Sequence, residues 1–213
     1  MPRLDMGATA TANLLALDAA HGVRFVAGCD EAGRGCIAGP LVAAAVLLDL
    51  GTIDRLRKTI GEVNDSKRLT AARRNALYGP ILANAKVAVV SRSAASIDQR
   101  GIQWANLNAL SESLERVSGH LDGDVIRLVD GFQLDGCDLP HKRLVRGDAS
   151  SAAIAAASII AKETRDRLMR RMHQRWPQYG FDRHCGYPTV AHKAAIAEHG
   201  ACPAHRVSFA GVS

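Results

Sequence analysis

The sequence of 213 residues is poor in aromatic residues and lacks long apolar segments. Aromatic side chains make up 4% of the residues although 47% are hydrophobic, so we expect a core of Ala, Val, Leu and Ile. The longest apolar runs, at 41–48 and 152–161, are well short of the ~20 residues that a membrane-spanning helix needs. Residues 1–20 also lack the apolar core of a signal peptide. We therefore predict no contact with a membrane.

Cysteine is also scarce. The sequence has five cysteines, an odd number, and no Cys-x-x-Cys pair. This usage favours reduced thiols in the cytoplasm over a disulfide framework. His199, Cys202 and His205 have the spacing of metal ligands, and a structural zinc site there stays open, although no fourth ligand is evident. A tail that happens to contain polar residues is the favoured alternative.

Positive charge, in contrast, is in excess. The formal net charge is +6 and the sequence pI is about 9.3. Because a basic surface attracts polyanions, this charge fits nucleic-acid binding, and a cationic protein without such a partner is the alternative. The length suits one domain. We expect a tail or short helix at 1–22, a folded core at 23–176 and a helical segment packed on it at 177–213. Nothing requires more than a monomer.

The apolar pattern predicts an α/β fold with a mixed five-stranded sheet. We expect strands at 24–29, 40–49, 86–92, 124–131 and 142–148. We expect helices within 66–85 and at 96–117, 151–172 and 189–200. The first three strands can pair antiparallel, whereas the last two follow longer connections and can run parallel. Helices would flank this sheet, with further helices at the C-terminus.

Four carboxylates stand at or just beyond the ends of predicted strands: Asp30, Glu31, Asp130 and Asp148. Neighbouring carboxylates repel one another and are costly to desolvate, so a common reason to gather them is a divalent cation. Mg²⁺ and Mn²⁺ prefer oxygen ligands. Two such ions ~4 Å apart can clamp the attacking and leaving oxygens of a phosphoryl transfer. The pattern therefore predicts a two-metal centre.

The neighbouring pair Asp30 and Glu31 poses a geometric problem. Adjacent residues of a strand point to opposite faces, so both can serve one site only if the strand ends or bulges there. The glycine-rich stretch GRGCIAG at 33–39 makes an end or a bulge plausible. Its GxGxxxG spacing is a weak match to a dinucleotide loop. Because no long helix follows it, we reject that reading.

The other acids have ordinary structural alternatives. Asp148 precedes a predicted helix and can be its cap, in competition with Ser150 and Ser151. Asp130 before Gly131 is a common turn pair. Taken singly, neither residue indicates a catalytic site.

The stretch GCDEAGRGCIAGPLVAAAV at 28–46 closely resembles the signature of bacterial ribonuclease HII, the type 2 ribonuclease H. Further blocks follow in order, and the resemblance covers Val23 to Phe209: NDSKRLT, LVDG, RGDASSAAIAAASIIAKETRDRLM, YGFDRHCGYPTVAHKAAI and HRVSF. It implies a ribonuclease H-like fold and metal-dependent hydrolysis of RNA in RNA–DNA hybrids. It also implies incision 5′ to single ribonucleotides in duplex DNA, which leaves a 3′-hydroxyl and a 5′-phosphate.

The resemblance also implies which residues act. The catalytic, metal-binding residues would be Asp30, Glu31, Asp130 and Asp148, with two Mg²⁺ or Mn²⁺ ions. Asp166 in TRDRLM is a further acid. It lies at least two helical turns beyond the apolar half of its helix, so we expect it to be structural or solvated.

Substrate-binding residues follow in the same way. Gly33, Arg34 and Gly35 would lie against the ribose of the scissile nucleotide, where backbone groups can bind the 2′-hydroxyl that distinguishes RNA from DNA. Tyr187 would sense the same hydroxyl and pack on the next deoxyribose, although its spacing alone favours a half-buried core tyrosine. Lys67 would lie near phosphates, and otherwise is a solvated charge.

The sequence departs from the family pattern at a few positions. Cys36 stands where proline is usual, and His184 and Cys185 replace a more usual Asn-Lys pair before the Gly-Tyr of CGYPT. These changes leave all four acids in place and bear most on the placement of Tyr187. Two other functions remain as alternatives: an inactive module that binds hybrids, and another nuclease or recombinase of the same fold that cuts DNA.

Overall fold

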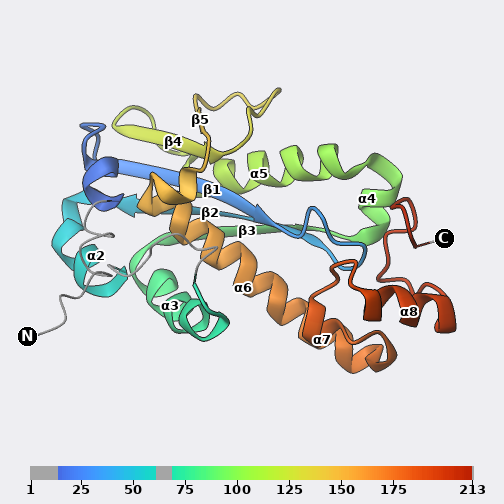
Figure 1. Cartoon of the computed structure of the whole chain (residues 1–213). Coiled ribbons are helices and arrows are strands. Elements are labelled where there is room, and N and C mark those ends of the chain that lie inside the picture. Colours follow the sequence, from blue (N-terminus) through green and yellow to red (C-terminus); the bar gives the residue numbers. More distant parts are fainter. Residues whose placement is uncertain (1–13, 61–68, 213) are drawn as a thin grey trace, which may run out of the picture.

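A mixed five-stranded sheet forms the centre of the protein (Figure 1). The structure is a computed structural model, which describes residues 14–60 and 69–212. The strands are β1 (Phe25–Ala32), β2 (Leu41–Asp49), β3 (Lys86–Arg92), β4 (Val125–Asp130) and β5 (Lys142–Leu144), in the order β3-β2-β1-β4-β5. β1 pairs antiparallel with β2, and β2 with β3, whereas β4 runs parallel to both β1 and β5. The predicted sheet is confirmed.

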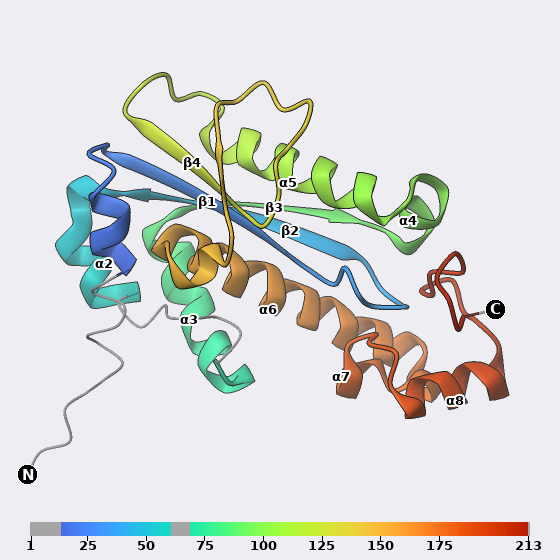
Figure 2. The ribbon, with the colours of Figure 1, turned by 45° about the horizontal axis from the view of Figure 1, so that its top comes forward.

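Different helices cover the two faces of the sheet. α6 (Ala152–Arg175) and α3 (Ala71–Asn84) lie on one face and α5 (Ile102–Ser118) on the other, as Figures 1 and 2 show. Alternate residues of a strand therefore enter two separate cores. Val26 of β1 packs in the core under α6, and Ala27 packs in the core under α5.

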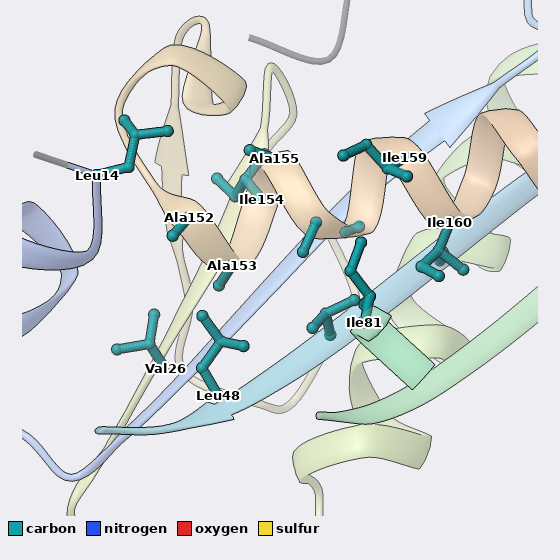
Figure 3. Close-up of a cluster of buried hydrophobic side chains, with 14 of the residues drawn as sticks. Leu14, Val26, Leu48, Ile81, Ala152, Ala153, Ile154, Ala155, Ile159 and Ile160 are labelled. Carbon is teal, nitrogen blue, oxygen red and sulfur yellow. The ribbon is translucent and has the colours of Figure 1, made fainter. Parts of the chain in front are cut away.

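The core under α6 consists of aliphatic side chains, many of them small, as the scarcity of aromatics predicts (Figure 3). The alanine-rich first half of α6 packs directly on the backbone of β1. A methyl group added at Gly28 would lie 2.3 Å from the Ile154 nitrogen, so any side chain there would push the helix away. This close contact places the start of α6 against β1, two residues before the predicted acid pair.

Several elements differ from the prediction. The helix expected at 96–117 is two helices, α4 (Ala94–Arg100) and α5, because Gly101 between them has a φ of 85° that a right-handed helix cannot contain. The last strand ends at Leu144 rather than 148. Arg146, with a φ of 56°, turns the chain there into the short 3₁₀ helix η2 (Gly147–Ala149). After β2 lie η1 (Leu50–Thr52) and α2 (Ile53–Ile60), where no element is predicted from the sequence.

The C-terminal elements pack against the far end of α6 (Figure 2). They are η3 (Pro177–Tyr179), α7 (Phe181–His184) and α8 (Val190–His199). Tyr179 and Phe181 form a third core with Met169 of α6. In the described part of the chain, no helix has the length and apolar character required to span a membrane.

Candidate active site

Two of the predicted acids lie side by side at the ends of neighbouring parallel strands. β1 and β4 are paired in register up to Cys29 and Val129, and Asp30 and Asp130 are the next residue on each strand. In-register neighbours on parallel strands lie ~4.8 Å apart and point to the same face. That face is the one under α6, because Gly28, two residues before Asp30, contacts the α6 backbone. The fold thus brings two carboxylates together beneath the start of α6.

Glu31 reaches the same place by a route that differs from the prediction. The expected end or bulge of the strand at Glu31 is wrong, because β1 continues to Ala32 with Glu31 directly opposite Ala43 of β2. What ends instead is the neighbouring strand, since β4 stops at Asp130. Beyond that point only the β2 side of β1 is paired in the described sheet. Glu31 points to the opposite face from Asp30, yet it can turn around this open edge into the same cavity.

This active-site cavity has a volume of about 400 Å³. Its walls come from β1 and the following turn, from β4, α3 and α6, and from the loop after α7. The lining residues are Asp30, Glu31, Ala32, Gly33, Arg34, Gly35, Arg74, Asp130, Ser158, Lys162 and Tyr187. The structure therefore brings together most of the predicted site. Lys67 lies outside the described residues.

Asp148 is buried in η2, immediately before α6, and is not among the residues that line the cavity. It is not the cap of α6, because Ser151 has that role: its Oγ accepts the Ile154 N–H at 3.3 Å. The neighbouring Gly147 N–H donates a hydrogen bond of 2.7 Å to Asp130 Oδ1. η2 therefore holds Asp130 in place through the Gly147 N–H and itself carries Asp148.

The carboxylates are oriented by backbone N–H groups. Asp30 Oδ1 accepts the Glu31 N–H at 2.7 Å, in the same manner as Asp130 Oδ1 accepts that of Gly147. Such hydrogen bonds favour the ionised form. The negative charge of these acids also affects the neighbouring Cys29. Burial, and then the charges of Asp30 and Glu31, raise the pKa of that thiol well above its usual value.

The donor set fits a hard divalent cation in its chemistry. Asp30, Glu31 and Asp130 offer carboxylate oxygens, which Mg²⁺ and Mn²⁺ prefer. Among the described residues, however, no three His, Cys, Asp and Glu side chains are grouped closely enough to hold a metal ion. The fit therefore concerns the type of ligand and the elements that carry it. The same finding applies to the possible zinc ligands His199, Cys202 and His205.

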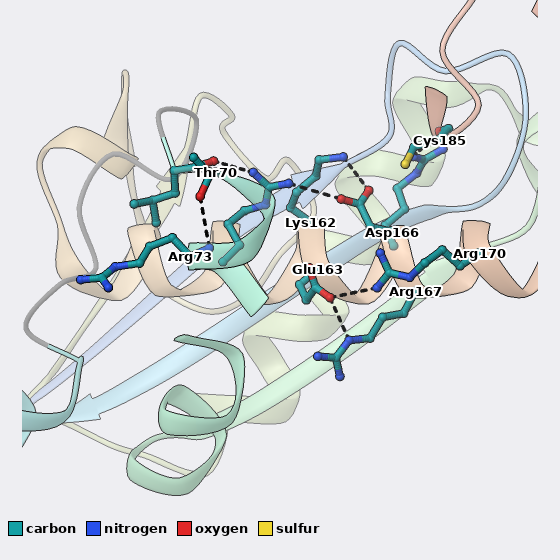
Figure 4. A network of polar contacts seen from close by, with 11 residues as sticks. Thr70, Arg73, Lys162, Glu163, Asp166, Arg167, Arg170 and Cys185 are labelled. Carbon is teal, nitrogen blue, oxygen red and sulfur yellow. Dashed lines mark hydrogen bonds and ion pairs between the residues drawn. The ribbon is translucent and has the colours of Figure 1, made fainter. Parts of the chain in front are cut away.

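Two cationic side chains, here called the cationic wall, line the same cavity as the acids, and they were not identified from the sequence. Lys162 of α6 and Arg74 of α3 both line the cavity. Asp166 holds them, with Lys162 Nζ at 2.6 Å and Arg74 Nη2 at 3.5 Å from its oxygens (Figure 4). Asp166 is buried, so of the two expected roles, structural or solvated, its environment leaves the structural one. The spacing of Lys162 and Asp166, four residues apart on a helix, is the signal that could have revealed the pair.

The glycine turn after β1 is shaped by a buried arginine. Gly33 has a φ of 96°, and a methyl group there would lie 2.0 Å from Arg165 Nε. Arg165 donates to the carbonyl oxygens of Pro40 at 2.8 Å, Ala38 at 3.0 Å and Cys185 at 2.7 Å. One guanidinium thus ties the glycine turn to the loop that carries Tyr187. A charged side chain in the middle of a long helix gives no sequence signal of this role.

A second buried arginine supports the same turn. Arg206 donates to the Gly39 carbonyl through Nε at 3.0 Å and Nη2 at 2.9 Å, and to the Arg34 carbonyl at 3.1 Å. Burial, and then the nearby positive charge of Arg165, lower the pKa of Arg206 to about 10. At the open side of the turn, Gly35 is exposed and has free space around its Cα, whereas the Arg34 guanidinium stacks 4.7 Å from the Phe132 ring centroid.

Tyr187 is at the mouth of the cavity. Its side chain is 45% exposed and not a core residue, and Lys162 Nζ lies 6.0 Å from its ring centroid. The preceding Gly186, with a φ of 81°, has no room for a side chain because a methyl group would lie 2.3 Å from the Ala38 carbonyl oxygen. The loop is therefore pressed against the glycine turn. Burial, followed by the charge of Asp166, raises the pKa of the Cys185 thiol to about 11.

Comparison with known proteins agrees with this geometry. The family model described as Ribonuclease HII matches residues 27–212. The chain belongs to the ribonuclease HII family. The ribonuclease HII of Delftia acidovorans is 49% identical over 195 residues, which cover 91% of this chain and 79% of that protein. That of Rhizobium johnstonii is 47% identical over 186 residues, covering 86% and 77%.

The fold agrees as well. The ribonuclease H2 of Pyrococcus horikoshii OT3 has a TM-score of 0.72 and 26% identity, covering 88% of this chain and 95% of that chain. The ribonuclease H-like fold implied by the sequence motifs is confirmed, and the chain is a ribonuclease H, a hydrolase.

Proposed function

We propose that this ribonuclease hydrolyses the RNA strand of RNA–DNA hybrids and incises duplex DNA 5′ to a single ribonucleotide, leaving a 3′-hydroxyl and a 5′-phosphate. One observation carries the proposal. Asp30 and Asp130, in register on parallel strands, share a cavity with Glu31 and face the cations Arg74 and Lys162. Acids on one side and cations on the other suit a metal-bound phosphodiester.

Asp30, Glu31, Asp130 and Asp148 would hold two Mg²⁺ or Mn²⁺ ions. Bound there, the ions would supply a water of lowered pKa and stabilise the leaving 3′-oxygen. The protein contributes position: the N–H groups of Glu31 and Gly147 hold one oxygen of Asp30 and of Asp130 in place. Carboxylates fixed in this way need little reorganisation during the reaction.

The cationic wall would bind the substrate backbone. Lys162 and Arg74 can contact phosphate oxygens beside the scissile bond, while their shared partner Asp166 restricts both side chains. Because Asp166 already balances part of their charge, these two side chains would bind a phosphate weakly enough for it to be released. This role parallels the one that the sequence resemblance implies for Lys67.

Recognition of the ribose would come from the glycine turn and Tyr187. The open space at Gly35 leaves the turn accessible to a sugar, and its backbone groups can bind the 2′-hydroxyl. Tyr187, exposed at the mouth of the cavity, can pack on the next deoxyribose. Arg165, which ties the two segments together, would keep the glycine turn and Tyr187 at a constant separation. All five cysteines are free, which fits a reducing cytoplasm.

The test uses a labelled DNA duplex with one ribonucleotide, an all-DNA duplex and an RNA–DNA hybrid, each with and without Mg²⁺ or Mn²⁺. We expect metal-dependent cleavage of the hybrid, a cut 5′ to the lone ribonucleotide, and an intact all-DNA duplex. Asp130→Asn should abolish cleavage but leave the melting temperature unchanged or slightly higher, because repulsion among the acids falls. Asp135→Asn, in the exposed loop after β4, is the matched control.

Each alternative function gives a different result. A module that only binds hybrids would retain them without cutting in any metal. A DNA nuclease of the same fold would cut the all-DNA duplex. Normal turnover by Asp130→Asn would remove Asp130 from the set of metal ligands.

A further inference from the structure

Three histidines, which the proposed catalysis does not use, form a cluster with the loop that carries Tyr187. His184, His192 and His205 come from α7, α8 and the C-terminal loop, and they pack with Tyr179 and Phe181. His192 and His205 are fully or almost fully buried. His205 belongs to the cluster whose spacing suggested zinc, but its ring nitrogens have other partners.

The hydrogen bonds of His205 and His192 define where each proton lies. The Cys202 N–H donates to His205 Nδ1 at 2.9 Å, so this nitrogen carries no proton and the proton of the neutral ring is on Nε2. His205 Nε2 lies 3.1 Å from His192 Nε2 and therefore donates to it. The remaining nitrogen of His192, Nδ1, must then carry the proton, and it lies 2.8 Å from the Tyr187 carbonyl oxygen.

The chain thus runs in one direction, from the Cys202 N–H through two neutral imidazoles to the Tyr187 carbonyl. His184 adds a parallel contact, because its Nδ1 accepts the Gly186 N–H at 3.1 Å and its Nε2 donates to the Tyr179 carbonyl at 2.7 Å. The His184 ring also stacks on His192, with centroids 4.2 Å apart.

Several backbone groups around Tyr187 are held by hydrogen bonds from neighbouring elements. Arg165 holds the Cys185 carbonyl, His184 holds the Gly186 N–H, and the Ile37 N–H binds the Gly186 carbonyl at 2.9 Å. The Tyr187 carbonyl accepts from His192 Nδ1 and from the Thr189 N–H, both at 2.8 Å. The exposed ring of Tyr187 is therefore carried by a backbone that has little freedom to move.

We propose that His192 and His205 are positioning residues, which act through an ordered pair of neutral tautomers to set the placement of Tyr187 over the ribonucleotide junction. The proposal rests on the proposed function of Tyr187 and names the residues that make it effective. Neither histidine touches the substrate. Loss of this chain of hydrogen bonds should lower cleavage at a lone ribonucleotide, because the Tyr187 ring would no longer be held where the sugar binds.

The first test is a double-mutant cycle on the duplex with one ribonucleotide. His192→Leu should lower kcat/KM by about tenfold to a hundredfold, the range expected for a misplacement near 1 Å. His192→Asn should recover part of the loss, because the amide nitrogen of Asn can replace Nδ1–H at the Tyr187 carbonyl. In the Tyr187→Ala background, His192→Leu should have little further effect, since the ring that it positions is gone.

His199→Leu is the matched control, on the same helix but outside the chain of hydrogen bonds. Thermal unfolding is measured for every variant to check that it is folded at the assay temperature. If the double variant loses kcat/KM by the product of the losses in His192→Leu and Tyr187→Ala, the proposal is overturned. A normal kcat/KM for His192→Leu would also overturn it. If the wild type fails to cut, the proposed function is at fault.

A second measurement needs no variant. Nitrogen-15 NMR of the labelled histidines reports which ring nitrogen is protonated, independently of activity. At neutral pH we expect the proton on Nδ1 in His192 and on Nε2 in His205. The reverse tautomers, or a doubly protonated His192, would contradict the ordered chain even if the enzyme is active.

Discussion

Replacement of Arg165 by methionine is the sharpest perturbation of the structure outside the acids. Arg165 is 1% exposed and donates to three carbonyl oxygens, those of Ala38, Pro40 and Cys185. Methionine is unbranched and has a helix propensity similar to that of arginine, so Arg165→Met mainly removes the three hydrogen bonds. A buried acceptor without a partner costs about 1–3 kcal/mol, so the gross loss is about 3–9 kcal/mol.

Two effects offset part of this loss. The guanidinium no longer has to be desolvated. Its repulsion with Arg206, which contributes to the lowered pKa of that residue, also disappears. We therefore expect a net loss of about 3 kcal/mol in the free energy of unfolding. For a chain of this size, that corresponds to a melting temperature about 6–12 °C lower.

Thermal unfolding followed by circular dichroism measures the shift, and Arg171→Met is the control because Arg171 is exposed on the same helix. The control should change the melting temperature by less than about 2 °C. Below the transition, Arg165→Met should also cut a lone ribonucleotide more slowly, since the glycine turn and the loop of Tyr187 are no longer tied together. A variant as stable and active as wild type would refute this account of Arg165.

Two further predictions concern the glycine turn and the buried histidines. Gly33→Ala should lower the melting temperature, because Gly33 has a φ of 96° and its Cα faces Arg165. Gly35→Ala places its methyl group in free space and should reduce only the cleavage of ribonucleotides. Equal shifts in melting temperature for the two variants would contradict this contrast. Burial lowers the pKa of His192 to about 4, and the His184 and His205 rings facing it add to this effect. Because the unfolded residue takes up a proton near pH 6.5, the contribution of His192 to the free energy of unfolding should be fully present above that pH, and about 3 kcal/mol of it should be lost as the pH drops towards 4. His192→Leu should flatten the profile in that window; an unchanged slope, measured by urea unfolding, would show that His192 is not the group responsible.

The parts of the site that could be predicted from the sequence depend on local pattern. Asp30 and Asp130 end apolar runs, and the alternation of a strand places such acids at one edge of a sheet. The position of Glu31 was expected for the wrong reason. β1 does not stop, and the space for Glu31 arises because β4, about a hundred residues later, ends first. No feature near residue 31 encodes the length of that strand.

The supporting residues could not be predicted because their partners are far away in the chain. Arg165 and Arg206 bind carbonyl groups of residues 34–40, which look like ordinary backbone in the sequence. Arg74 meets Asp166 only when α3 packs on α6. Gly101 is different, since an isolated glycine inside a helical pattern does warn of a break.

The central claim is that Asp30, Glu31, Asp130 and Asp148 together hold two divalent ions at one phosphodiester. The most direct measurement is the anomalous scattering of Mn²⁺ in crystals of the wild-type protein with a duplex that contains one ribonucleotide, under conditions that slow cleavage. The account predicts two Mn²⁺ peaks ~4 Å apart, each bound by carboxylate oxygens of this group and by the scissile phosphate. Peaks elsewhere, or acids too far apart to share an ion when substrate is bound, would contradict it.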